Sequence, residues 1–379
     1  MFMSSEINLN VFQPIVKSWY ESLKNPLEAQ NDVLSRLLED YEKTGYGQTH
    51  GASKVKEISD FRKQFPIQNY WGFMPQFEEI QKGNYAAILP EPLLCWVMTR
   101  GSTGPAKVIP TTQTHLQQIL LCGARALVNY ALRKKDPEMM TGKILNLNFP
   151  SNVHTTNLNG KTMTYGYSSG TYARLNPMLD KVSLLPRQEE IDAVGSGISR
   201  KDWEGRFELA YQRCLDQNVV ATMGVTPVVL AFARYVQRKH GRKPRDLWHF
   251  KALFCTSVRK IPYKYASILK KYFGEVPVVE IYSATEGVFA QQLDELPYVT
   301  PNYDTYLFEV ETGKEVKMLH QLKRGEWGKL VFSSCLFPRY DIGDLVEAAG
   351  NNYFRVIGRN NLSTRVEHQL SKLFFGWLI

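Results

Sequence analysis

The sequence has few cysteines, and none of them is placed to form a disulfide framework or to bind a metal. The five cysteines are far apart, odd in number and never arranged as Cys-x-x-Cys, so neither a disulfide scaffold nor a zinc site is indicated. Reduced thiols in a cytoplasmic protein are the plain interpretation. The seven histidines include no His-x-x-x-His or His-Glu-x-x-His spacing, which argues against a helical zinc motif.

Long hydrophobic runs are also missing. No apolar run approaches the ~20 residues that a helix needs to cross a bilayer, and Met1–Asn10 lacks the basic and apolar regions of a secretory signal. We therefore expect no membrane partner. Internal repeats and low-complexity stretches are absent as well, which argues against a solenoid or a disordered chain.

What the sequence does have is the composition of an ordinary globular protein. Its 379 residues are enough for one large domain or two modest ones, and 44% hydrophobic with 22% charged residues can build a sizeable core. The net charge of +9 favours anionic ligands. A nucleotide, pyrophosphate, a carboxylate or a nucleic acid would all qualify, so charge alone does not choose among them.

Strand and helix patterns alternate through most of the chain. Two helices are predicted between Asn10 and Tyr46, and further helices over Gln113–Arg133, Trp203–Leu215, Thr226–Lys239 and Tyr263–Phe273. Strands are predicted over Lys143–Asn148, Val219–Met223, Leu253–Thr256 and Val278–Tyr282. Such alternation predicts an α/β fold in which a mainly parallel sheet is flanked by helices.

The pattern changes near residue 300. Short alternating runs separated by Gly and Asn follow, such as Tyr306 to Val310 and Tyr353 to Ile357, and they predict a small antiparallel β subdomain. We therefore expect an α/β core over residues 1–300 and the β subdomain over 301–357.

A glycine-rich loop, Thr99–Lys107, follows the apolar run Leu93–Met98 and precedes the helix predicted from Gln113. Its glycines would let backbone amides approach phosphate oxygens, its hydroxyls would add donors and its lysine would add positive charge. The residues concerned are Gly101, Ser102, Thr103, Gly104 and Lys107. The spacing is not that of a Walker loop, and alone it fits a surface turn equally well.

Two further motifs follow in a fixed order. Tyr282 ends an apolar strand and is followed closely by Thr285 and Glu286, so an aromatic face and a carboxylate would lie at the carboxyl edge of a sheet, where open α/β folds bind ligands. Asp344, which follows a glycine, could accept hydrogen bonds from ribose hydroxyls, and Arg359 lies shortly after it. Separately, each motif is explained as well by an ordinary turn or surface residue.

The order and spacing of the three motifs resemble those of adenylate-forming enzymes, the superfamily of acyl-CoA synthetases, luciferases and adenylation domains. The glycine loop resembles their Thr-Ser-Gly-Thr-Thr-Gly-x-Pro-Lys signature, Tyr282–Glu286 their Tyr-Gly-x-Thr-Glu motif, and Tyr340–Asp344 their Tyr-x-Thr-Gly-Asp motif. Within the superfamily, the stretches Tyr282–Gln291 and Gly325–Asp344 look most like the auxin-responsive-type acyl-acid amido synthetases. The resemblance covers roughly residues 90 to 360.

The resemblance implies that ATP activates a carboxylic acid as an acyl-adenylate, with Mg²⁺ as cofactor, before transfer to an amine or a thiol of an amino acid, CoA or a carrier protein. It implies catalytic roles for Lys107, Thr285 and Glu286, with Glu286 as the Mg²⁺ ligand. Nucleotide contacts are implied for Thr99, Gly101, Ser102, Thr103, Gly104, Thr256, Ser257, Tyr282, Asp344 and Arg359. For the acid, the expected wall residues are Tyr165, Tyr167, Met223 and Val225, although ordinary packing explains each of these four as well.

Three departures from the family pattern are visible. Arg100 replaces a small hydroxyl residue in the glycine loop, and Pro105 stands one position earlier than the family's proline. No sequence resembling the mobile C-terminal domain follows Gly358, so residues 358–379 are expected to be a hinge remnant without that lid. A domain or partner protein supplied in trans is one possible substitute for it.

Two alternatives to the ligase remain open. A core that binds a nucleotide or acyl-adenylate without turnover would explain Arg100 and the missing lid. Nucleic-acid binding is suggested by the basic run Arg238–Arg245, but a solvated helix end explains such a run more simply. We expect no nucleic-acid partner.

Overall fold

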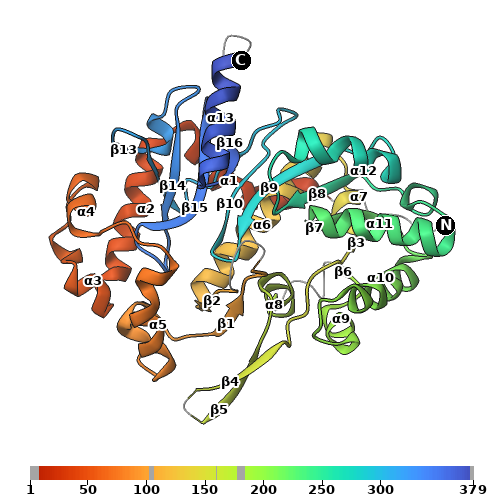
Figure 1. Ribbon diagram of the computed structural model, residues 1–379, viewed down its shortest axis with the longest axis horizontal. Helices are drawn as coiled ribbons and strands as arrows, with labels where there is room; N and C mark the ends of the chain where they lie inside the picture. Colours follow the sequence, from red (N-terminus) through yellow and green to blue (C-terminus); the bar gives the residue numbers. More distant parts are fainter. Residues whose placement is uncertain (1–7, 102–105, 159, 177–183, 376–379) are drawn as a thin grey trace. The chain divides into compact units, whose positions relative to one another are not determined.

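The computed structural model describes residues 8–101, 106–158, 160–176 and 184–375. The chain forms two compact units (Figure 1). The first unit comprises Met1–Tyr20 and Leu93–Pro297, and the second comprises Glu21–Pro92 and Tyr298–Ile379. Helix α1 (Gln13–Lys24) carries the chain from the first unit into the second. The second unit is thus built from two segments far apart in the sequence.

The first unit contains most of the predicted α/β alternation. Its helices are α6 (Gln113–Lys134), α7 (Glu138–Thr141), α8 (Ser168–Arg174), α9 (Gln188–Val194), α10 (Arg200–Cys214), α11 (Thr226–His240) and α12 (Ala266–Phe273). Its strands are β1 (Cys95–Met98), β2 (Val108–Thr111), β3 (Lys143–Leu145), β4 (His154–Leu158), β5 (Lys161–Tyr165), β6 (Leu184–Leu185), β7 (Val219–Val225), β8 (Ala252–Thr256), β9 (Val278–Ala284) and β10 (Gly287–Gln291).

The main sheet of this unit is largely parallel, as predicted. Its strands follow the order β10-β9-β8-β7-β3-β6. The pairs β3–β6, β3–β7, β7–β8 and β8–β9 are parallel, and only β10 runs antiparallel to its neighbour β9. Strand β7 begins with four fully buried residues, Val219–Thr222, as expected for a parallel strand covered on both faces.

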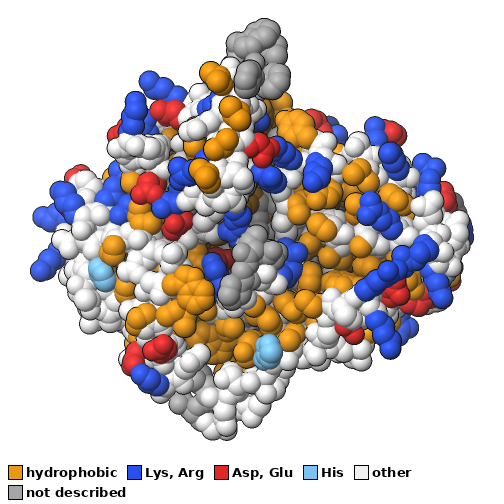
Figure 2. All heavy atoms as spheres, in the orientation of Figure 1, with side chains coloured by type: hydrophobic (Ala, Val, Ile, Leu, Met, Phe, Trp, Pro, Cys, Tyr) orange, Lys and Arg blue, Asp and Glu red, His pale blue; other side chains and the backbone are white. Residues whose placement is uncertain are grey.

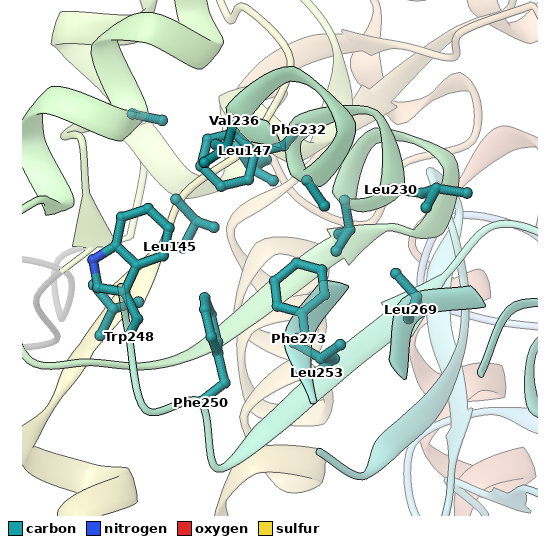
Figure 3. Packing of buried hydrophobic residues seen from close by; sticks show 14 of the residues in the cluster. Leu145, Leu147, Leu230, Phe232, Val236, Trp248, Phe250, Leu253, Leu269 and Phe273 are labelled. Carbon is teal, nitrogen blue, oxygen red and sulfur yellow. The ribbon is translucent and has the colours of Figure 1, made fainter. Parts of the chain in front are cut away.

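The hydrophobic core on one face of this sheet is rich in aromatic side chains (Figure 3). Phe232 of α11 and Phe273 of α12 pack over Leu253 of β8, and all three are almost completely buried. Trp248 lies in the same cluster, where its indole N–H donates a 2.7 Å hydrogen bond to the carbonyl of Cys214. This core fixes the positions at which β7, β8 and β9 end.

The glycine-rich loop differs from the expected strand–loop–helix arrangement. Strand β1 pairs antiparallel with β2, with Met98 opposite Val108, so the loop connects two strands of a hairpin. Its ends are closed by hydrogen bonds between Thr99 and Lys107, from N–H of Thr99 to the Lys107 carbonyl and from N–H of Lys107 to the Thr99 hydroxyl, both 2.9 Å. Helix α6 begins only at Gln113, after β2. The prediction that the loop leads directly into the helix was therefore wrong.

The second unit contains an antiparallel sheet, which confirms the prediction of antiparallel strands after residue 300. Its helices are α2 (Pro26–Tyr41), α3 (Gly45–Thr49), α4 (Ile58–Gln64), α5 (Met74–Gln81) and α13 (Leu362–Phe375). Its strands are β11 (Thr300–Pro301), β12 (Leu307–Glu311), β13 (Val316–Met318), β14 (Trp327–Ser333), β15 (Tyr340–Gly350) and β16 (Tyr353–Arg359). The order β13-β12-β14-β15-β16 is antiparallel throughout.

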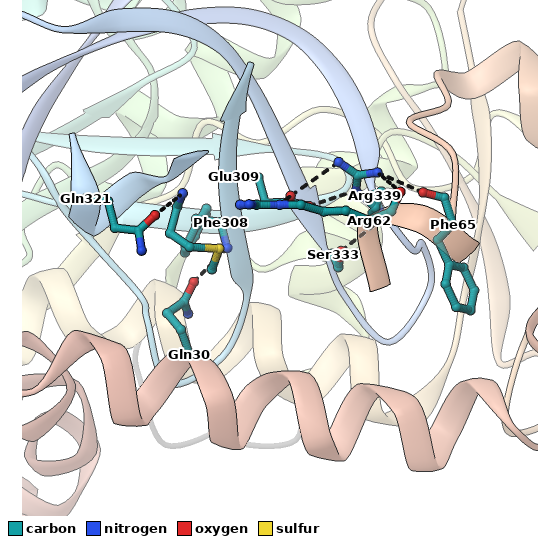
Figure 4. A network of polar contacts seen from close by, with 9 residues as sticks. Gln30, Arg62, Phe65, Phe308, Glu309, Gln321, Ser333 and Arg339 are labelled. Atoms are coloured by element: carbon teal, nitrogen blue, oxygen red, sulfur yellow. Dashed lines mark hydrogen bonds and ion pairs between the residues drawn. The ribbon is translucent and has the colours of Figure 1, made fainter. Parts of the chain in front are cut away.

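A buried ionic network stabilises this second unit (Figure 4). Glu309 on β12 accepts from Arg339 at 2.9 Å and from Arg62 at 2.7 Å. Arg339 also donates to the backbone carbonyls of Arg62 and Phe65. Both Glu309 and Arg339 are less than 5% exposed, so each charge depends on the other for its compensation. Arg339, at the start of the third motif, thus has a structural role.

Candidate functional site

The carboxyl ends of β7, β8 and β9 form the edge at which open α/β sheets bind ligands. Hydroxyl side chains join these three strand ends. Thr226 donates a 2.8 Å hydrogen bond to the carbonyl of Thr256, and the hydroxyls of Thr256 and Ser283 are 2.8 Å apart. Ser257, directly after β8, has a left-handed backbone with φ of 74°, a strained conformation often found at functional sites. The predicted nucleotide contacts of Thr256 and Ser257 stay predictions.

Thr285 and Glu286 form the tip of the β9–β10 hairpin. Ala284 pairs directly with Gly287, so these two residues alone make the turn. Hairpin tips are ordinarily exposed, but here Thr285 is only 7% and Glu286 only 3% exposed. The Thr285 hydroxyl donates to the hydroxyl of Ser168 at 3.1 Å. The tip is therefore fixed inside the first unit.

A buried histidine and tyrosine support this tip. The hydroxyl of Tyr172 on α8 donates to the Thr285 carbonyl at 2.9 Å, and His115 Nε2 lies 3.2 Å from the same hydroxyl. Because the tyrosine proton is used toward Thr285, His115 donates from Nε2 and carries no proton on Nδ1. Burial lowers the pKa of His115 to about 4, so the ring is neutral at physiological pH. Sequence reasoning missed both residues.

The glycine loop and the hairpin tip meet through an ion pair. Lys107 Nζ lies 3.8 Å from Glu286 Oε1, and the side chains are 26% and 5% exposed. A carboxylate so deeply buried needs a cation nearby. Gly101, at the start of the loop, has φ of 64°, a backbone conformation that favours glycine. The predicted contacts at Ser102, Thr103 and Gly104 lie outside the described residues.

Tyr282 occupies an interior position on β9. Its side chain is only 8% exposed, and its ring lies 5.4 Å from that of Phe289 on β10. Two residues of the strand therefore separate the tyrosine from the hairpin tip, and its ring packs against the neighbouring strand. Stacking on adenine stays a prediction.

Two of the four expected acid-binding residues belong to one apolar cluster. Met98, Phe149, Tyr167 and Val225 pack together, and the rings of Phe149 and Tyr167 are 5.2 Å apart. Tyr165 instead contacts His154, its cross-strand partner in the β4–β5 hairpin, at 5.6 Å between rings. The structure thus brings Tyr167 and Val225 together with two residues that sequence reasoning did not select.

Gly224 marks open space near the carboxyl end of β7. It lies between Met223 and Val225 near the carboxyl end of β7. A β-carbon added to Gly224 would meet no atom of the described residues within 4 Å. Open space therefore exists at this strand end, on the face of the sheet opposite to the side chain of Val225.

Asp344 and Arg359, in the second unit, lie directly opposite each other on β15 and β16. Arg359 Nη1 is 3.4 Å from Asp344 Oδ1 and donates to the Ile342 carbonyl at 2.6 Å. The arginine side chain is 46% exposed and the aspartate side chain 14%. This arrangement holds the carboxylate in place and leaves the guanidinium accessible to a ligand.

The donor set suits an ion that arrives with a nucleotide better than a resident metal. Among the described residues, no group of three or more His, Cys, Asp or Glu side chains could hold a metal ion. Mg²⁺ commonly takes one or two carboxylates together with substrate phosphates and water. The single carboxylate of Glu286 beside the glycine loop fits that mode, and Mg²⁺ binding stays a prediction.

A separate hollow lies at the opposite edge of the parallel strands. Its volume is about 510 Å³, and its lining includes Asn218 and Lys251, which directly precede β7 and β8, together with Trp248. None of the predicted site residues lines it. This hollow is therefore distinct from the edge that carries the motifs.

Within the described ranges, none of the helices combines the length and the hydrophobicity of a transmembrane span.

The comparisons with known proteins agree with this geometry. A profile described as the GH3 family N-terminal domain matches residues 15–193. The solved structure of the AtGH3.15 acyl acid amido synthetase in complex with 2,4-DB superimposes with a TM-score of 0.72 at 15% identity, over 95% of this chain and 72% of that one. A second structure of GH3.15 gives 0.73 at 17% identity over the same shares. No curated protein sequence is significantly similar to this chain.

An acyl-CoA ligase has a similar fold. The open conformation of 2-hydroxyisobutyryl-CoA ligase, solved with 2-HIB-AMP and CoA, gives a TM-score of 0.58 at 14% identity, over 86% of this chain and 74% of that one. The chain therefore shares the fold of these acyl acid amido synthetases and of this CoA ligase. Its match to the GH3 family N-terminal domain is confined to residues 15–193, just under half of the chain.

Proposed function

We propose that this protein uses ATP to activate a carboxylic acid as an acyl-adenylate and then transfers the acyl group to an amine or a thiol. The observation that carries this proposal is the ion pair between Lys107 and Glu286, because it joins the glycine loop to a buried carboxylate. Charge neutralisation around a phosphate and alignment of the reactants are what such a reaction requires of a protein.

In the first step, a carboxylate oxygen of the acid attacks the α-phosphorus of ATP. The bond from that phosphorus to the bridging oxygen breaks, and pyrophosphate leaves with both electrons. Lys107 would stabilise the phosphate charge, and Glu286 would hold the Mg²⁺ that comes with the nucleotide, which would neutralise further phosphate charge. Thr285, fixed at the hairpin tip, binds the α-phosphate. No proton has to move in this step.

In the second step, an amine or thiol attacks the acyl carbon, loses its proton, and AMP leaves. The acceptor is an amino acid, CoA or a carrier protein, and a C-terminal domain or a partner protein completes its site. The amido synthetases and the CoA ligase among the similar structures support both kinds of acceptor.

The remaining nucleotide contacts are divided between adenine and ribose. Tyr282, Thr256 and Ser257 face the adenine, and Asp344 accepts hydrogen bonds from the ribose hydroxyls with Arg359 beside it. Thr99 and Gly101 shape the loop that surrounds the phosphates, to which Ser102, Thr103 and Gly104 contribute. The pairing of Asp344 with Arg359 supports the ribose assignment, because it orients the carboxylate before the nucleotide binds.

A cytoplasmic location suits this chemistry. All five cysteines are free and buried, as expected where thiols stay reduced. The basic run gives little support to nucleic-acid binding, because Arg238 pairs with Glu204 at 2.7 Å and His240 with Glu208 at 3.0 Å. Figure 2 also shows acidic side chains among the basic ones on the face in view.

The test is acid-dependent exchange of pyrophosphate into ATP by the purified chain, over a panel of aryl, indolyl and fatty acids. Lys107→Ala and Glu286→Gln should each lower exchange by about 100-fold or more, as removal of a group that stabilises transition-state charge does. Lys43→Ala is the matched control, because Lys43 is an exposed lysine paired with Asp40 at 2.8 Å.

Normal exchange in both site variants would contradict the assignment of Lys107 and Glu286. Binding of ATP by the folded protein without exchange for any acid would favour the second candidate, a core that binds a nucleotide or acyl-adenylate without turnover.

A further inference from the structure

Arg100 lies beside the apolar cluster and not among charged residues. It follows β1, whose last residue, Met98, donates a 2.9 Å hydrogen bond to the Gly166 carbonyl and bridges to Tyr167. The Arg100 guanidinium lies over the ring of Phe149, 5.4 Å from its centre. The loop thus brings a permanent positive charge to the wall formed by Met98, Phe149, Tyr167 and Val225.

No residue in the described part of the chain forms an ion pair or hydrogen bond with the Arg100 side chain. Burial alone lowers the pKa of Arg100, and no carboxylate acts on it. Two fully buried arginines differ, since Arg339 is paired with Glu309 and Arg125 donates to the Ser18 hydroxyl. A partly desolvated guanidinium that contacts only an aromatic ring can still bind an anion, because its hydrogen-bond donors are not used.

A second guanidinium borders the same wall. Arg206 on α10 is 3% exposed and lies over the ring of Trp203, 5.2 Å from its centre, and the edge of Trp203 packs on Phe149 at 4.8 Å. Its Nη2 donates to the carbonyls of Gly195 and Gly197. Its Nε and Nη1 are buried without a hydrogen-bond partner among the described residues. A second positive charge therefore lies near the aromatic wall, and the carboxylates of Asp202 and Asp192 act on it.

From these contacts we propose that the acid activated by this protein is an apolar or aromatic acid that carries a second anionic group, and that Arg100 binds this second group. The inference rests on the proposed function. The apolar wall would receive the body of the acid.

The chemistry of the first step explains why Arg100 serves the second group and not the reacting carboxylate. The reacting carboxylate loses its negative charge when the acyl-adenylate forms. A fixed cation on it would stabilise the free acid more than the transition state and would slow the reaction. A second anionic group keeps its charge throughout, so its ion pair with Arg100 contributes equally to binding of substrate and transition state.

The experiment compares matched acids with and without a second carboxylate: phenylacetate against 4-carboxyphenylacetate, and hexanoate against adipate. Pyrophosphate exchange is measured for the parent, Arg100→Met, which keeps the apolar stem, and Arg100→Lys, which keeps the charge. Arg200→Met is the control, because Arg200 is an exposed arginine on α10 with a surface partner, Glu204. Thermal unfolding of each variant establishes that it is folded.

The parent should prefer the diacid of each pair. Arg100→Met should lower kcat/KM for the diacids by about 10- to 100-fold, the loss expected for one charge-assisted hydrogen-bonded pair, while the monoacids and the KM for ATP stay unchanged. Arg100→Lys should recover part of the loss. Equal losses for both members of a pair, or a raised KM for ATP, would overturn the inference.

Calorimetric binding of 4-carboxyphenylacetate and adipate to the parent and to Arg100→Met separates this inference from the proposed function. Diacid binding that weakens in Arg100→Met, in a protein without exchange activity, would support the acid site and refute adenylation. Exchange that occurs only with monoacids would support adenylation and refute the role of Arg100. If no diacid binds to the folded parent, the inference fails.

Discussion

The hydroxyl of Tyr172 donates a hydrogen bond to the backbone carbonyl of Thr285, although the two residues are 113 positions apart in the sequence. This bond, together with His115 behind it, holds the tip of the β9–β10 hairpin from the side of helix α8. The tip carries Glu286 toward Lys107, so the geometry of the ion pair depends on a tyrosine that is not part of any of the three motifs.

Replacement of Tyr172 by Phe should therefore reduce activity while leaving the fold intact. We expect exchange kcat to fall by about 5-fold, the equivalent of one lost hydrogen bond of about 1 kcal/mol, with little change in the KM for ATP. Tyr235→Phe is the control, since its hydroxyl donates to Glu208 at 2.7 Å outside the site. Equal loss of activity in both variants would indicate a general effect of stability and not a role in positioning.

Replacement of Gly224 by Val should narrow the range of acids. The added side chain enters open space at the carboxyl end of β7, and the strand backbone accepts a β-branched residue. Exchange with indolyl acids should fall by about 10-fold or more, because a steric mismatch in an apolar pocket weakens binding by about this factor. Exchange with acetate should stay unchanged.

Gly123→Ala, in helix α6, is the control for the glycine substitution, because a β-carbon there also meets nothing within 4 Å. If Gly224→Val lowers pyrophosphate exchange equally with large and with small acids, the space at Gly224 does not belong to the acid site.

Glu280 on β9 makes stability depend on pH in a defined direction. Burial raises its pKa from the ordinary value of 4.5 to about 7. Between these two pH values the folded protein holds a proton that the unfolded chain releases, so stability falls as pH rises, by up to about 3 kcal/mol in total.

Glu280→Gln removes this titration. The variant should gain stability over the parent at pH 8 and little at pH 4.5, as measured by urea unfolding at both values. A difference between the two proteins that is the same at pH 4.5 and pH 8 would show that the carboxyl group is ionised in the folded state throughout.

The buried network in the second unit should be sensitive to the loss of one partner. Arg339→Met leaves Glu309 with Arg62 as its remaining ionic partner, and the cost should be about 3 kcal/mol or more in the free energy of unfolding. The exposed pair of Lys43 and Asp40 provides the comparison, since Lys43→Met should cost under about 1 kcal/mol. Similar urea midpoints for the two variants would contradict the structural role of Arg339.

The sequence predicts the parallel sheet well because its strands are rich in apolar residues, as in the fully buried start of β7. Each end of strands β7, β8 and β9 lies within two residues of its predicted position. The β4–β5 hairpin was not predicted, because its strands, such as His154–Leu158, are mainly polar. Strand β2 was missed for another reason, since it is short and contains Pro110, a residue that disfavours strands.

Many residues of the candidate site belong to local sequence motifs, but the buried residues that hold them in place do not. Lys107 and Glu286 belong to separate motifs, and the resemblance to a family places both in one site. His115 and Tyr172 lie on helices among ordinary residues, and no local pattern connects them with Thr285. Only the packing of α6 and α8 brings them together.

The two-residue turn at Thr285 and Glu286 also limits how such a protein can be altered. A single residue inserted or deleted there would shift the register of β10 and turn its side chains to the opposite face of the sheet. All five residues of β10 are buried. Reversing the faces of their side chains would therefore disrupt the packing on both sides of the strand. The length of this hairpin therefore has to stay constant, so residues in the site can be changed by substitution and not by insertion or deletion at the tip.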